Sequence, residues 1–474
     1  MSALWFSWDD LRRITGGDWL APGPRPQSAA GVSAVCDDSR AIRPGALFMA
    51  IRGEAADGHR FVASAAAAGA GAVCVCQDPD AETLAALRSR GCPVLRVADT
   101  LAAFQRLARE HRRSMRQVVV VGITGSCGKT STKEMLAAVL ARRYPGAVLK
   151  TEGNTNNHFG VPRNLLRLEA GHRAAVIEMG TNHPGEIAAL ARLAEPDLGV
   201  VSTIGAAHLE YFGDLAGVAR EKGDLLALTA GTGIAVLPCE AAHADILRAK
   251  AGSRRVVTFG TGPGADVVVA YEGLCGAGAA FTLSWPREGR CVRVEWPLVG
   301  AHQALNAGAA AAVGRALGLS PEEIALGLGQ TALPAMRLER RTVAGVNWVN
   351  DAYNANPDSM RAGIESFLEL SAAAAPVDRV MVLGDMLEQG PLGQAAHREL
   401  LRWVAERAGG AAVIPIGALM AAAAAEIGLD AYPDAAAAAA VVRGGARPGR
   451  WIFVKGSRGL HLEALLPPRE EADR

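Results

Sequence analysis

Short apolar runs alternate with longer amphipathic segments along most of the chain. A short apolar run bounded by glycine or polar residues is typical of a strand buried in a parallel sheet. Apolar residues at helical spacing are typical of a helix that covers such a sheet. The alternation therefore predicts an α/β protein. We expect strands at 46–51, 71–76, 93–97, 118–121, 174–178, 197–203, 233–237, 346–350, 379–383, 411–415 and 451–454.

Breaks in this alternation divide the chain into three units. An amphipathic helix predicted over 99–115 carries the chain from the first set of strands to the second. Helical signals are absent between 256 and 299, where recurring β-like segments predict an antiparallel flap. The strand–helix pattern starts again after Pro334. We therefore expect domains at 1–98, 99–332 and 333–474, which agrees with ~150 residues per domain.

Composition narrows the functional classes. Lys and Arg number 49 against 48 Asp and Glu, so the net charge is +1 and predicts neither a nucleic-acid site nor an anionic-membrane site. No stretch reaches the ~18 uninterrupted apolar residues that a membrane span requires. The 8 cysteines form no C-x-x-C pair with metal-ligand spacing, and the position of Cys127 in the glycine-rich turn at 122–128 favours a reducing compartment. We expect a cytoplasmic protein.

The strand expected at 118–121 leads into a glycine-rich turn at 122–128 and then into a helix. Backbone N–H groups of such a turn converge on an anion, and the helix start adds unpaired donors and its positive dipole end. Lys129 would neutralise phosphate charge, and the Thr130 hydroxyl would hold a magnesium ion. Strict Walker spacing needs a glycine where this chain has Ile123. We interpret the segment as a nucleotide site rather than as a simple connecting turn.

Other polar residues carry weaker signals when taken alone. The asparagine cluster at 154–157 is equally consistent with a turn and with a ligand site. Glu178 ends an apolar strand, where a carboxylate either binds magnesium or accepts hydrogen bonds from a helix N-terminus. His208 and Lys222 follow the 197–203 strand, and local sequence does not connect either of them to a metal.

Taken together, motifs in all three units resemble the Mur ligase family of ATP-dependent amide-forming enzymes. The resemblance runs from about residue 33 to residue 460. Two positions depart from the usual family pattern, which often has asparagine in place of Gln303 and leucine in place of Gln389. The matching motifs are Asp38-Ser39-Arg40, Pro44-Gly45, Asp57-Gly58-His59, 122–130, 152–157, 177–180, 208–213, Glu221-Lys222, Gly300-Ala301-His302 with Asn306, 336–339, 351–357, 383–386 and 455–458.

The resemblance implies a fold and a reaction. The fold is a central P-loop parallel-sheet ATPase domain between an N-terminal UDP-substrate α/β domain and a C-terminal Rossmann-like α/β domain. The motifs near the start look like the branch that joins D-alanyl-D-alanine to a UDP-N-acetylmuramoyl-tripeptide through an acyl phosphate. ATP and two magnesium ions are the implied cofactors. A monomer is expected, and closure of the third domain is expected to gate catalysis.

The resemblance also implies roles for individual residues. Catalytic roles fall on Lys129, Glu178, His208 and Lys222. One magnesium would use Thr130 and Glu178, and the second would use His208 and a carbamate formed on Lys222. ATP contacts fall on Thr124, Gly125, Ser126, Cys127, Gly128, Lys129, Thr130, Ser131, Asn306, Arg337, Asp351, Tyr353 and Asn354. Substrate contacts fall on Ser39, Arg40, Asn154, Asn156, Asn157, Lys455 and Ser457.

Two other interpretations remain open at this point. A related amide ligase, such as a tripeptide-forming muramyl ligase or a folylpolyglutamate synthase, would share most of the motifs. A P-loop switch protein or kinase would explain Lys129 and Thr130. It would leave the asparagine cluster at 154–157, Lys222 and the 455–458 motif without a role.

Overall fold

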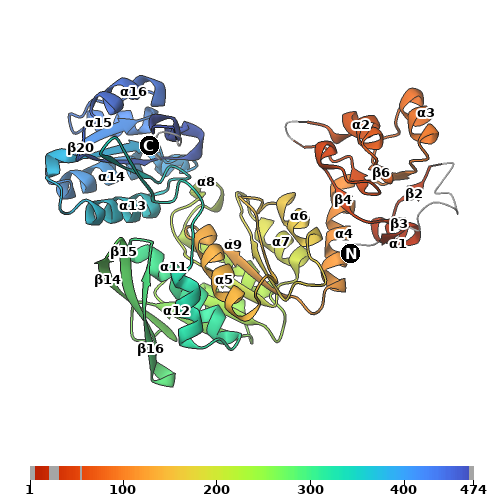
Figure 1. The fold of residues 1–474 in the computed structure, drawn as a ribbon, viewed down its shortest axis with the longest axis horizontal. Coiled ribbons are helices and arrows are strands. Elements are labelled where there is room, and N and C mark those ends of the chain that lie inside the picture. Colours follow the sequence, from red (N-terminus) through yellow and green to blue (C-terminus); the bar gives the residue numbers. More distant parts are fainter. Residues whose placement is uncertain (1–5, 21–30, 54–55, 469–474) are drawn as a thin grey trace.

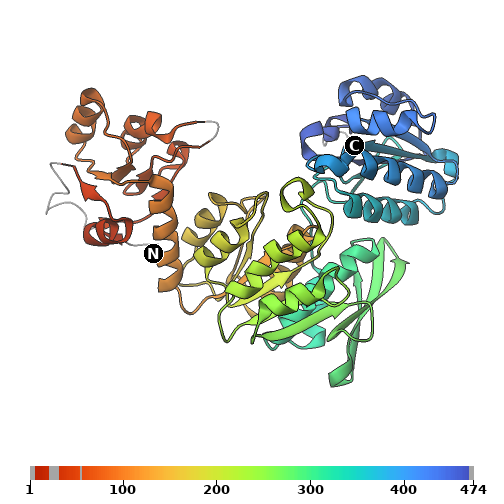
Figure 2. The same cartoon turned by 180° about the vertical axis from the view of Figure 1, so that it is seen from behind.

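The computed structural model describes residues 6–20, 31–53 and 56–468. Three α/β domains follow one another along the molecule (Figure 1). The N-terminal and C-terminal domains lie at opposite ends of the central domain, as the view from behind also shows (Figure 2). The three-domain α/β fold predicted above is confirmed. The boundaries at 98 and 332 stay predictions.

The N-terminal domain contains a small sheet in the order β2-β7-β6-β5-β4. The strands predicted at 46–51, 71–76 and 93–97 are the three inner strands of this sheet. They run parallel because a helical segment connects each of them to the next. The strands are β2 (Asp18–Trp19), β4 (Val35–Cys36), β5 (Leu47–Met49), β6 (Ala72–Val75) and β7 (Val94–Arg96). A separate pair joins β1 (Phe6–Ser7) to β3 (Gly31–Val32). The α-helices are α1 (Trp8–Thr15), α2 (Val62–Ala67) and α3 (Ala81–Ser89), with 3-10 turns η1 (Ser39–Ala41) and η2 (Gly58–Phe61).

Helix α4 (Thr100–Ser114) joins this domain to the central one. Its predicted apolar side is buried at Phe104, Leu107 and Ala108, whereas Leu101 is only partly buried. Asp99 begins the helix by accepting the N–H groups of Leu101 and Ala102.

The central sheet has the order β16-β15-β14-β13-β12-β11-β8-β10-β9. Strands β8 to β13 are parallel, and the antiparallel flap is confirmed for β14 to β16. Strand β13 was not predicted; it pairs parallel to β12 because helix α10 (Ala244–Ala251) carries the chain back to the same end of the sheet. The strands are β8 (Val119–Thr124), β9 (Val148–Lys150), β10 (Ala174–Glu178), β11 (Leu198–Val201), β12 (Ile234–Pro238), β13 (Arg255–Gly260), β14 (Val267–Cys275), β15 (Gly278–Trp285) and β16 (Arg290–Trp296).

Helices cover this sheet and fix the phosphate-loop helix α5. Both α11 and α12 pack on α5, and α9 packs on α7 and β11. Ser320 caps α12 in a capping box with Glu323, as its sequence predicts. The helices are α5 (Lys129–Arg143), α6 (Gly160–Leu166), α7 (Glu186–Ala194), α8 (Leu209–Phe212), α9 (Leu215–Leu228), α10 (Ala244–Ala251), α11 (Ala301–Ala316) and α12 (Pro321–Gly329).

The C-terminal sheet has the order β17-β18-β21-β19-β20. Strand β17 was not predicted, because its sequence Glu-Arg-Arg-Thr-Val carries no apolar run; it pairs antiparallel to β18 at one edge. The strands are β17 (Glu339–Val343), β18 (Val346–Asn350), β19 (Arg379–Gly384), β20 (Ala412–Ile416) and β21 (Trp451–Lys455). The helices are α13 (Pro357–Leu370), α14 (Gly393–Arg407), α15 (Ala418–Ala425) and α16 (Ala435–Gly444). The 3-10 turn η5 (Gly390–Leu392) lies between β19 and α14, and η6 (Arg458–Leu460) lies after β21.

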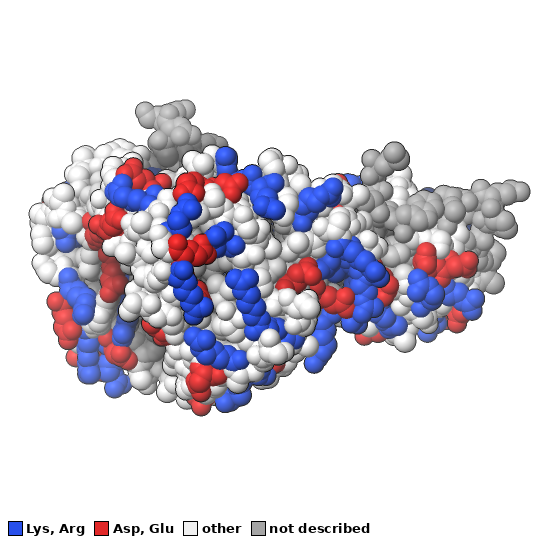
Figure 3. Space-filling model, turned by 90° about the horizontal axis from the view of Figure 1, so that it is seen from below, with Lys and Arg blue, Asp and Glu red and all other residues white. Residues whose placement is uncertain are grey.

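The distribution of surface charge and the state of the cysteines agree with the balanced charge and the cysteine spacing of the sequence. Basic and acidic side chains are interspersed on the face shown in Figure 3. All eight cysteines are free thiols. Among the helices of the described ranges, none is both long and apolar enough to cross a bilayer.

Candidate active site

The glycine-rich turn joins β8 to the first turn of α5. Gly125 and Gly128 have positive φ angles of 152° and 79°. A Cβ on Gly125 would lie 2.0 Å from Ser202 Oγ, and one on Gly128 would lie 2.2 Å from Asn306 Oδ1. Both positions therefore require glycine, and the backbone can approach an anion closely. Gly122 lies within β8 instead, which explains why the spacing departs from the Walker pattern.

Lys129 and Thr130 begin helix α5. Lys129 Nζ donates to Gly125 O at 2.7 Å, and burial lowers the pKa of Lys129. Thr130 Oγ1 donates to Glu178 Oε2 at 3.0 Å and accepts from Arg337 Nη2 at 2.9 Å. The Thr130 hydroxyl thus joins residues of two domains that are more than 200 positions apart in the sequence.

Glu178 ends β10, which pairs directly with the phosphate-loop strand β8. Its carboxylate is 2% exposed and accepts Asn156 Nδ2 on Oε1 at 2.8 Å. The Glu178 N–H donates to Thr151 Oγ1 at 3.0 Å. The buried Lys133 Nζ lies 3.9 Å from Glu178 Oε2 and donates to Thr151 O at 2.8 Å. A fixed cation and two hydrogen-bond donors therefore surround this acid.

The three clustered asparagines do not share one role. Asn156 contacts Glu178, whereas Asn157 Oδ1 accepts the N–H groups of Phe159 and Gly160 at the start of α6. Asn154 is exposed. Asn157 therefore serves the turn at the start of α6, Asn156 contacts the strand-end acid Glu178, and the substrate contacts expected of all three asparagines stay predictions.

Asn306, expected as an ATP contact, lies against the phosphate loop. It is 5% exposed, and its amide donates to Gln303 Oε1 at 3.3 Å. Gln303, one of the two departures from the family pattern, is thus in contact with Asn306. Thr124, at the end of β8, and Ser131, in the first turn of α5, are both buried.

Along the chain, His208 directly precedes helix α8, and Lys222 lies on α9, the helix that follows α8. His208 has a positive φ of 55°, and its Nδ1 lies 2.8 Å from Glu388 Oε2 of the C-terminal domain. Lys222 is 1% exposed on α9. Within the described residues no hydrogen bond or ion pair reaches its amine. Burial, with the Lys129 charge next in size, lowers the pKa of Lys222 to about 7.

The neighbour of Lys222 has a different partner. Glu221 is buried, and its carboxylate accepts Gly185 N at 2.7 Å and Ile187 N at 2.8 Å at the start of α7. This contact fixes α9 against α7 and leaves Lys222 unpaired beside the phosphate loop.

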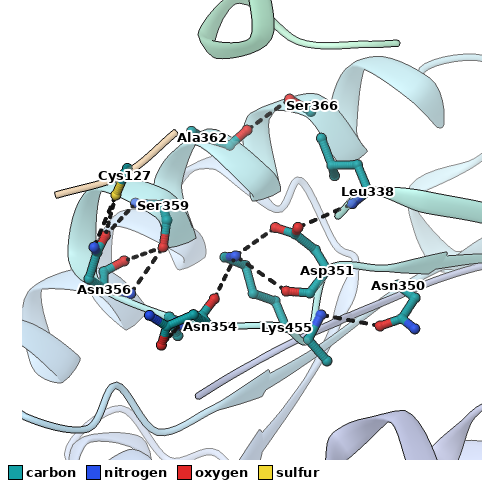
Figure 4. A network of polar contacts seen from close by, with 12 residues as sticks. Cys127, Leu338, Asn350, Asp351, Asn354, Asn356, Ser359, Ala362, Ser366 and Lys455 are labelled. Carbon is teal, nitrogen blue, oxygen red and sulfur yellow. Dashed lines mark hydrogen bonds and ion pairs between the residues drawn. The ribbon is translucent and has the colours of Figure 1, made fainter. Parts of the chain in front are cut away.

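The C-terminal domain presents Arg337 to the phosphate loop. Its guanidinium lies 4.1 Å from the ring centre of Tyr353. Asp351 Oδ1 accepts Leu338 N at 3.1 Å, and Asp351 Oδ2 pairs with Lys455 Nζ at 2.6 Å (Figure 4). The aspartate therefore holds the segment that carries Arg337.

Of three residues of the C-terminal domain that were expected at ligands, Lys455 and Ser457 are buried within the domain and Asn354 is exposed. Lys455 Nζ contacts Asp351 and donates to Asn354 O at 3.0 Å (Figure 4). Ser457 is 4% exposed, and its hydroxyl accepts Leu387 N at 2.9 Å. Asn354 itself is exposed, with its Oδ1 accepting Ala355 N.

Ser39 and Arg40 lie in η1 of the N-terminal domain, at the far end of the molecule from the C-terminal domain (Figure 1). Arg40 forms a two-point pair with Asp38 at 2.9 and 2.8 Å, which lowers the pKa of Asp38 to about 2. Arg163 of α6 pairs with Asp37 at 2.8 Å and ties this domain to the central one. The structure does not bring Ser39 and Arg40 to the phosphate loop.

Sequence reasoning missed several residues of this region. Lys133 lies one turn after Thr130 on α5, but its burial depends on the packing of the sheet against that helix. Asn356, within the 351–357 motif, and Asp358, directly after it, were given no role, yet both contact the central domain. The contact of Glu388 with His208 depends on the docking of two domains, which local sequence does not encode.

Metal binding at Thr130 and Glu178 would depend on oxygen ligands. Among the described residues no group of three or more His, Cys, Asp and Glu side chains forms a metal cage. Magnesium keeps several waters and uses one or two carboxylates with substrate phosphates. The adjacent oxygens of Thr130 and Glu178 suit that pattern.

Comparison with known proteins covers all three domains. Three family models match: "Mur ligase family, catalytic domain" at residues 32–109, "Mur ligase middle domain" at 123–314, and "Mur ligase, glutamate ligase domain" at 336–458. A UDP-N-acetylmuramoyl-tripeptide–D-alanyl-D-alanine ligase from Treponema pallidum is 34% identical over 93% of this chain and 94% of its own length. The Bacillus subtilis ligase of that name is 35% identical over 78% of this chain and 76% of its own.

Solved structures give the same result. The crystal structure of MurF from Acinetobacter baumannii has a TM-score of 0.87 and 34% identity, with 98% of each chain covered. MurF ligase from Thermotoga maritima in complex with ADP has a TM-score of 0.78 and 26% identity, covering 91% of this chain and 96% of its own.

Proposed function

The chain belongs to the Mur ligase family, and we propose that it joins D-alanyl-D-alanine to a UDP-N-acetylmuramoyl-tripeptide at the expense of ATP. It is an ADP-forming amide ligase, and its product is the UDP-muramoyl-pentapeptide precursor of peptidoglycan. The observation that carries the proposal is the meeting at Thr130 of Glu178, from the central sheet, with Arg337, from the C-terminal domain.

The chemistry explains why such a meeting is needed. A carboxylate resists attack by an amine because oxide is a poor leaving group, and phosphorylation supplies a better one. In the first step a carboxylate oxygen of the tripeptide attacks the γ-phosphorus of ATP, and ADP leaves. In the second step the dipeptide amine attacks the acyl carbon, the tetrahedral intermediate expels phosphate, and the amine loses a proton. Two anions must meet in the first step, so cations at the site lower the barrier.

We assign the cations on this chain to Lys129 and Arg337. Lys129 starts α5 and would hold the β- and γ-phosphates, for which its contact with Gly125 O must break. Arg337, held by Tyr353 and by the Asp351 contact with Leu338, would contact phosphate as well. Asp351, Tyr353 and Asn354 would lie beside the ribose, and Asn306 beside the adenine.

Thr130 and Glu178 would hold one magnesium ion, and His208 with Lys222 would hold a second. Magnesium supplies charge neutralisation on the phosphates when bound. The buried, unpaired amine of Lys222 fits this role only after modification, because an ammonium cannot bind a cation. An amine with a pKa of about 7 is in its neutral form in about half of the molecules at pH 7. Its attack on carbon dioxide releases one proton and gives a carbamate, which has the oxygen ligands that magnesium prefers.

The substrates would span the domains. Ser39 and Arg40 would contact the UDP moiety, and Asn156 would contact the peptide portion near Glu178. Asn154 and Asn157 remain proposed as substrate contacts through their loop. Lys455 and Ser457 would act on the incoming dipeptide by shaping the C-terminal domain, since both side chains are buried in it.

The proposal is tested by asking which substrates ATP turnover requires. We expect ADP release only when a UDP-muramoyl-tripeptide and D-alanyl-D-alanine are both present, with one pentapeptide formed per ADP. A panel of UDP-muramoyl peptides and folates separates this activity from those of related ligases. ATP hydrolysis that continues without either substrate and yields no amide would overturn the ligase assignment.

A further inference from the structure

The N-terminus of helix α13 lies directly against the phosphate loop. Asn356 caps α13 by accepting Ser359 N at 2.8 Å, and its amide nitrogen also lies 3.0 Å from Cys127 Sγ (Figure 4). The capping box with Ser359 fixes the Asn356 side chain. The C-terminal domain therefore meets the nucleotide loop through a rigid helix end rather than through a free loop.

A second contact lies in the first turn of the same helix. Asp358 Oδ2 accepts the backbone N–H of Ala206 at 3.2 Å, across the domain boundary. The neighbouring Gly205 faces the same carboxylate, and a Cβ there would lie 2.0 Å from Asp358 Oδ2. Apart from Gly205 and its two chain neighbours, the nearest atom of the central domain to that Cβ is Ser126 Cβ, at 3.7 Å. The glycine thus leaves room for the other domain's side chain, not for its own.

The segment that Asp358 contacts supports the phosphate loop. Gly205 N donates to Ser126 Oγ at 3.0 Å, and Ser126 Oγ donates to Gly205 O at 2.9 Å. The Cys127 N–H donates to Thr203 Oγ1 at 2.8 Å. Two residues beyond Ala206 comes His208. One short segment therefore contacts the loop, the C-terminal domain and the histidine region.

We propose that Asp358 is a positioning residue that couples closure of the C-terminal domain to the shape of the phosphate loop. Its carboxylate holds the 203–206 segment in the form that supports Ser126 and Cys127, and it contacts the segment only when the domain is closed. Gly205 is the matching half of this contact. The inference rests on the proposed nucleotide site and adds to it a residue outside the phosphate loop.

The test is a double-mutant cycle in the full chain, with Mg-ADP affinity measured by calorimetry and closure by small-angle X-ray scattering. Asp358→Ala and Gly205→Ala each remove the same contact, so each should weaken ADP binding about tenfold. Changes that act on one contact do not add. We therefore expect the double variant to be weaker by about tenfold as well, not by about a hundredfold. Asp358→Asn keeps an acceptor oxygen and should remain within about threefold of the unchanged chain.

Two variants serve as matched controls. Glu322 occupies in α12 the position that Asp358 occupies in α13, the second residue after the cap and next to a proline. Glu322→Ala removes an acid from a helix start without touching the other domain. Gly231→Ala adds a Cβ that meets nothing within 4 Å. Both controls should leave ADP affinity and closure unchanged.

The outcomes separate coupling from a local effect. Additive losses in the double variant, or equal losses in the Glu322→Ala control, would show that Asp358 and Gly205 act only within their own domains. Unchanged ADP affinity in Asp358→Ala would equally overturn the proposal. If the unchanged chain binds ADP but forms no pentapeptide, the ligase assignment fails, while the cycle in ADP affinity still decides the role of Asp358.

Discussion

Two lysines of the central domain are equally buried but lie in opposite environments. Lys133, on the phosphate-loop helix α5, is 0% exposed, donates to Thr151 O and pairs with Glu134 at 3.0 Å. Lys222, on α9, is 1% exposed, and no described residue forms a hydrogen bond or ion pair with its amine. Burial then lowers the pKa of Lys222 to about 7.

The difference shows that partners, not burial, decide what a buried lysine does. A buried charge is tolerated when it is paired and hydrogen-bonded, so Lys133 can act as a fixed structural cation behind Glu178. Without partners the neutral amine is the less costly form, and a neutral amine is nucleophilic. Lys222 therefore has the properties of a reactive group, and Lys133 has those of a support.

The largest expected effect is on ligation. Lys222→Ala should nearly abolish pentapeptide formation, as should Lys129→Ala, because losing one preorganised charge contact at a phosphoryl centre costs about 3 kcal/mol or more. Added formate or acetate should restore part of the Lys222→Ala rate by replacing the carbamate oxygens, but should not restore Lys129→Ala. Near-normal rates in Lys222→Ala without added carboxylate would rule out the carbamate assignment.

The next effect contrasts the two lysines directly in stability. Lys133→Met leaves Glu134 with one fewer partner and should lower local stability by about 3 to 5 kcal/mol. Lys222→Met removes an amine whose burial is unfavourable at neutral pH, so it should raise stability there by about 1 kcal/mol or more instead of lowering it. Hydrogen exchange of the amides in α5 and α9 measures each helix separately from the other domains. Equal losses in both variants would contradict the comparison.

The sequence predicted the parts of the site that lie at the ends of neighbouring strands. Thr130 follows β8 and Glu178 ends β10, and these two strands pair directly, so their meeting follows from the rule for parallel sheets. The phosphate loop was likewise predicted from its glycine-rich turn between a strand and a helix. The structure gives the reason for Gly125 and Gly128, because their positive φ angles and close contacts allow no side chain.

The remaining parts depend on packing that local sequence does not encode. Lys133 looked like an ordinary residue of a good helix former, and its burial arises only when β9 and β10 cover α5. The motifs placed Arg337 and His208 in the site by resemblance, but their contacts with Thr130 and Glu388 exist only because two domains dock. Within the asparagine cluster, Asn156 contacts Glu178 whereas Asn157 accepts an N–H group at the start of α6, since each contact depends on the direction of the side chain.

A smaller effect is expected in the pH dependence of stability. The folded pKa of Lys222 is about 7, below its ordinary value of 10.5, so the unfolded chain binds more protons between these two pH values. Stability therefore rises with pH across this window and falls as pH drops towards 7, by at most about 1.4 kcal/mol per pH unit. The thermal midpoint of the unchanged chain, relative to Lys222→Met in buffer free of carbon dioxide, should rise from pH 7 to 9. A flat difference would place the folded pKa of Lys222 near its ordinary value.

The smallest effect comes from a third lysine that shares a partner with Lys133. Lys150 also pairs with Glu134, but its side chain is 47% exposed and it lies on the surface of β9. Lys150→Met should cost less than about 1 kcal/mol, because solvent screens an exposed pair and replaces its partner. Hydrogen exchange of α5 in this variant, set beside Lys133→Met, separates two explanations for the role of Lys133. If Lys150→Met costs as much, neutralising Glu134 is what matters. If it costs little, the contacts of Lys133 with Thr151 and Glu178 are what hold the site together.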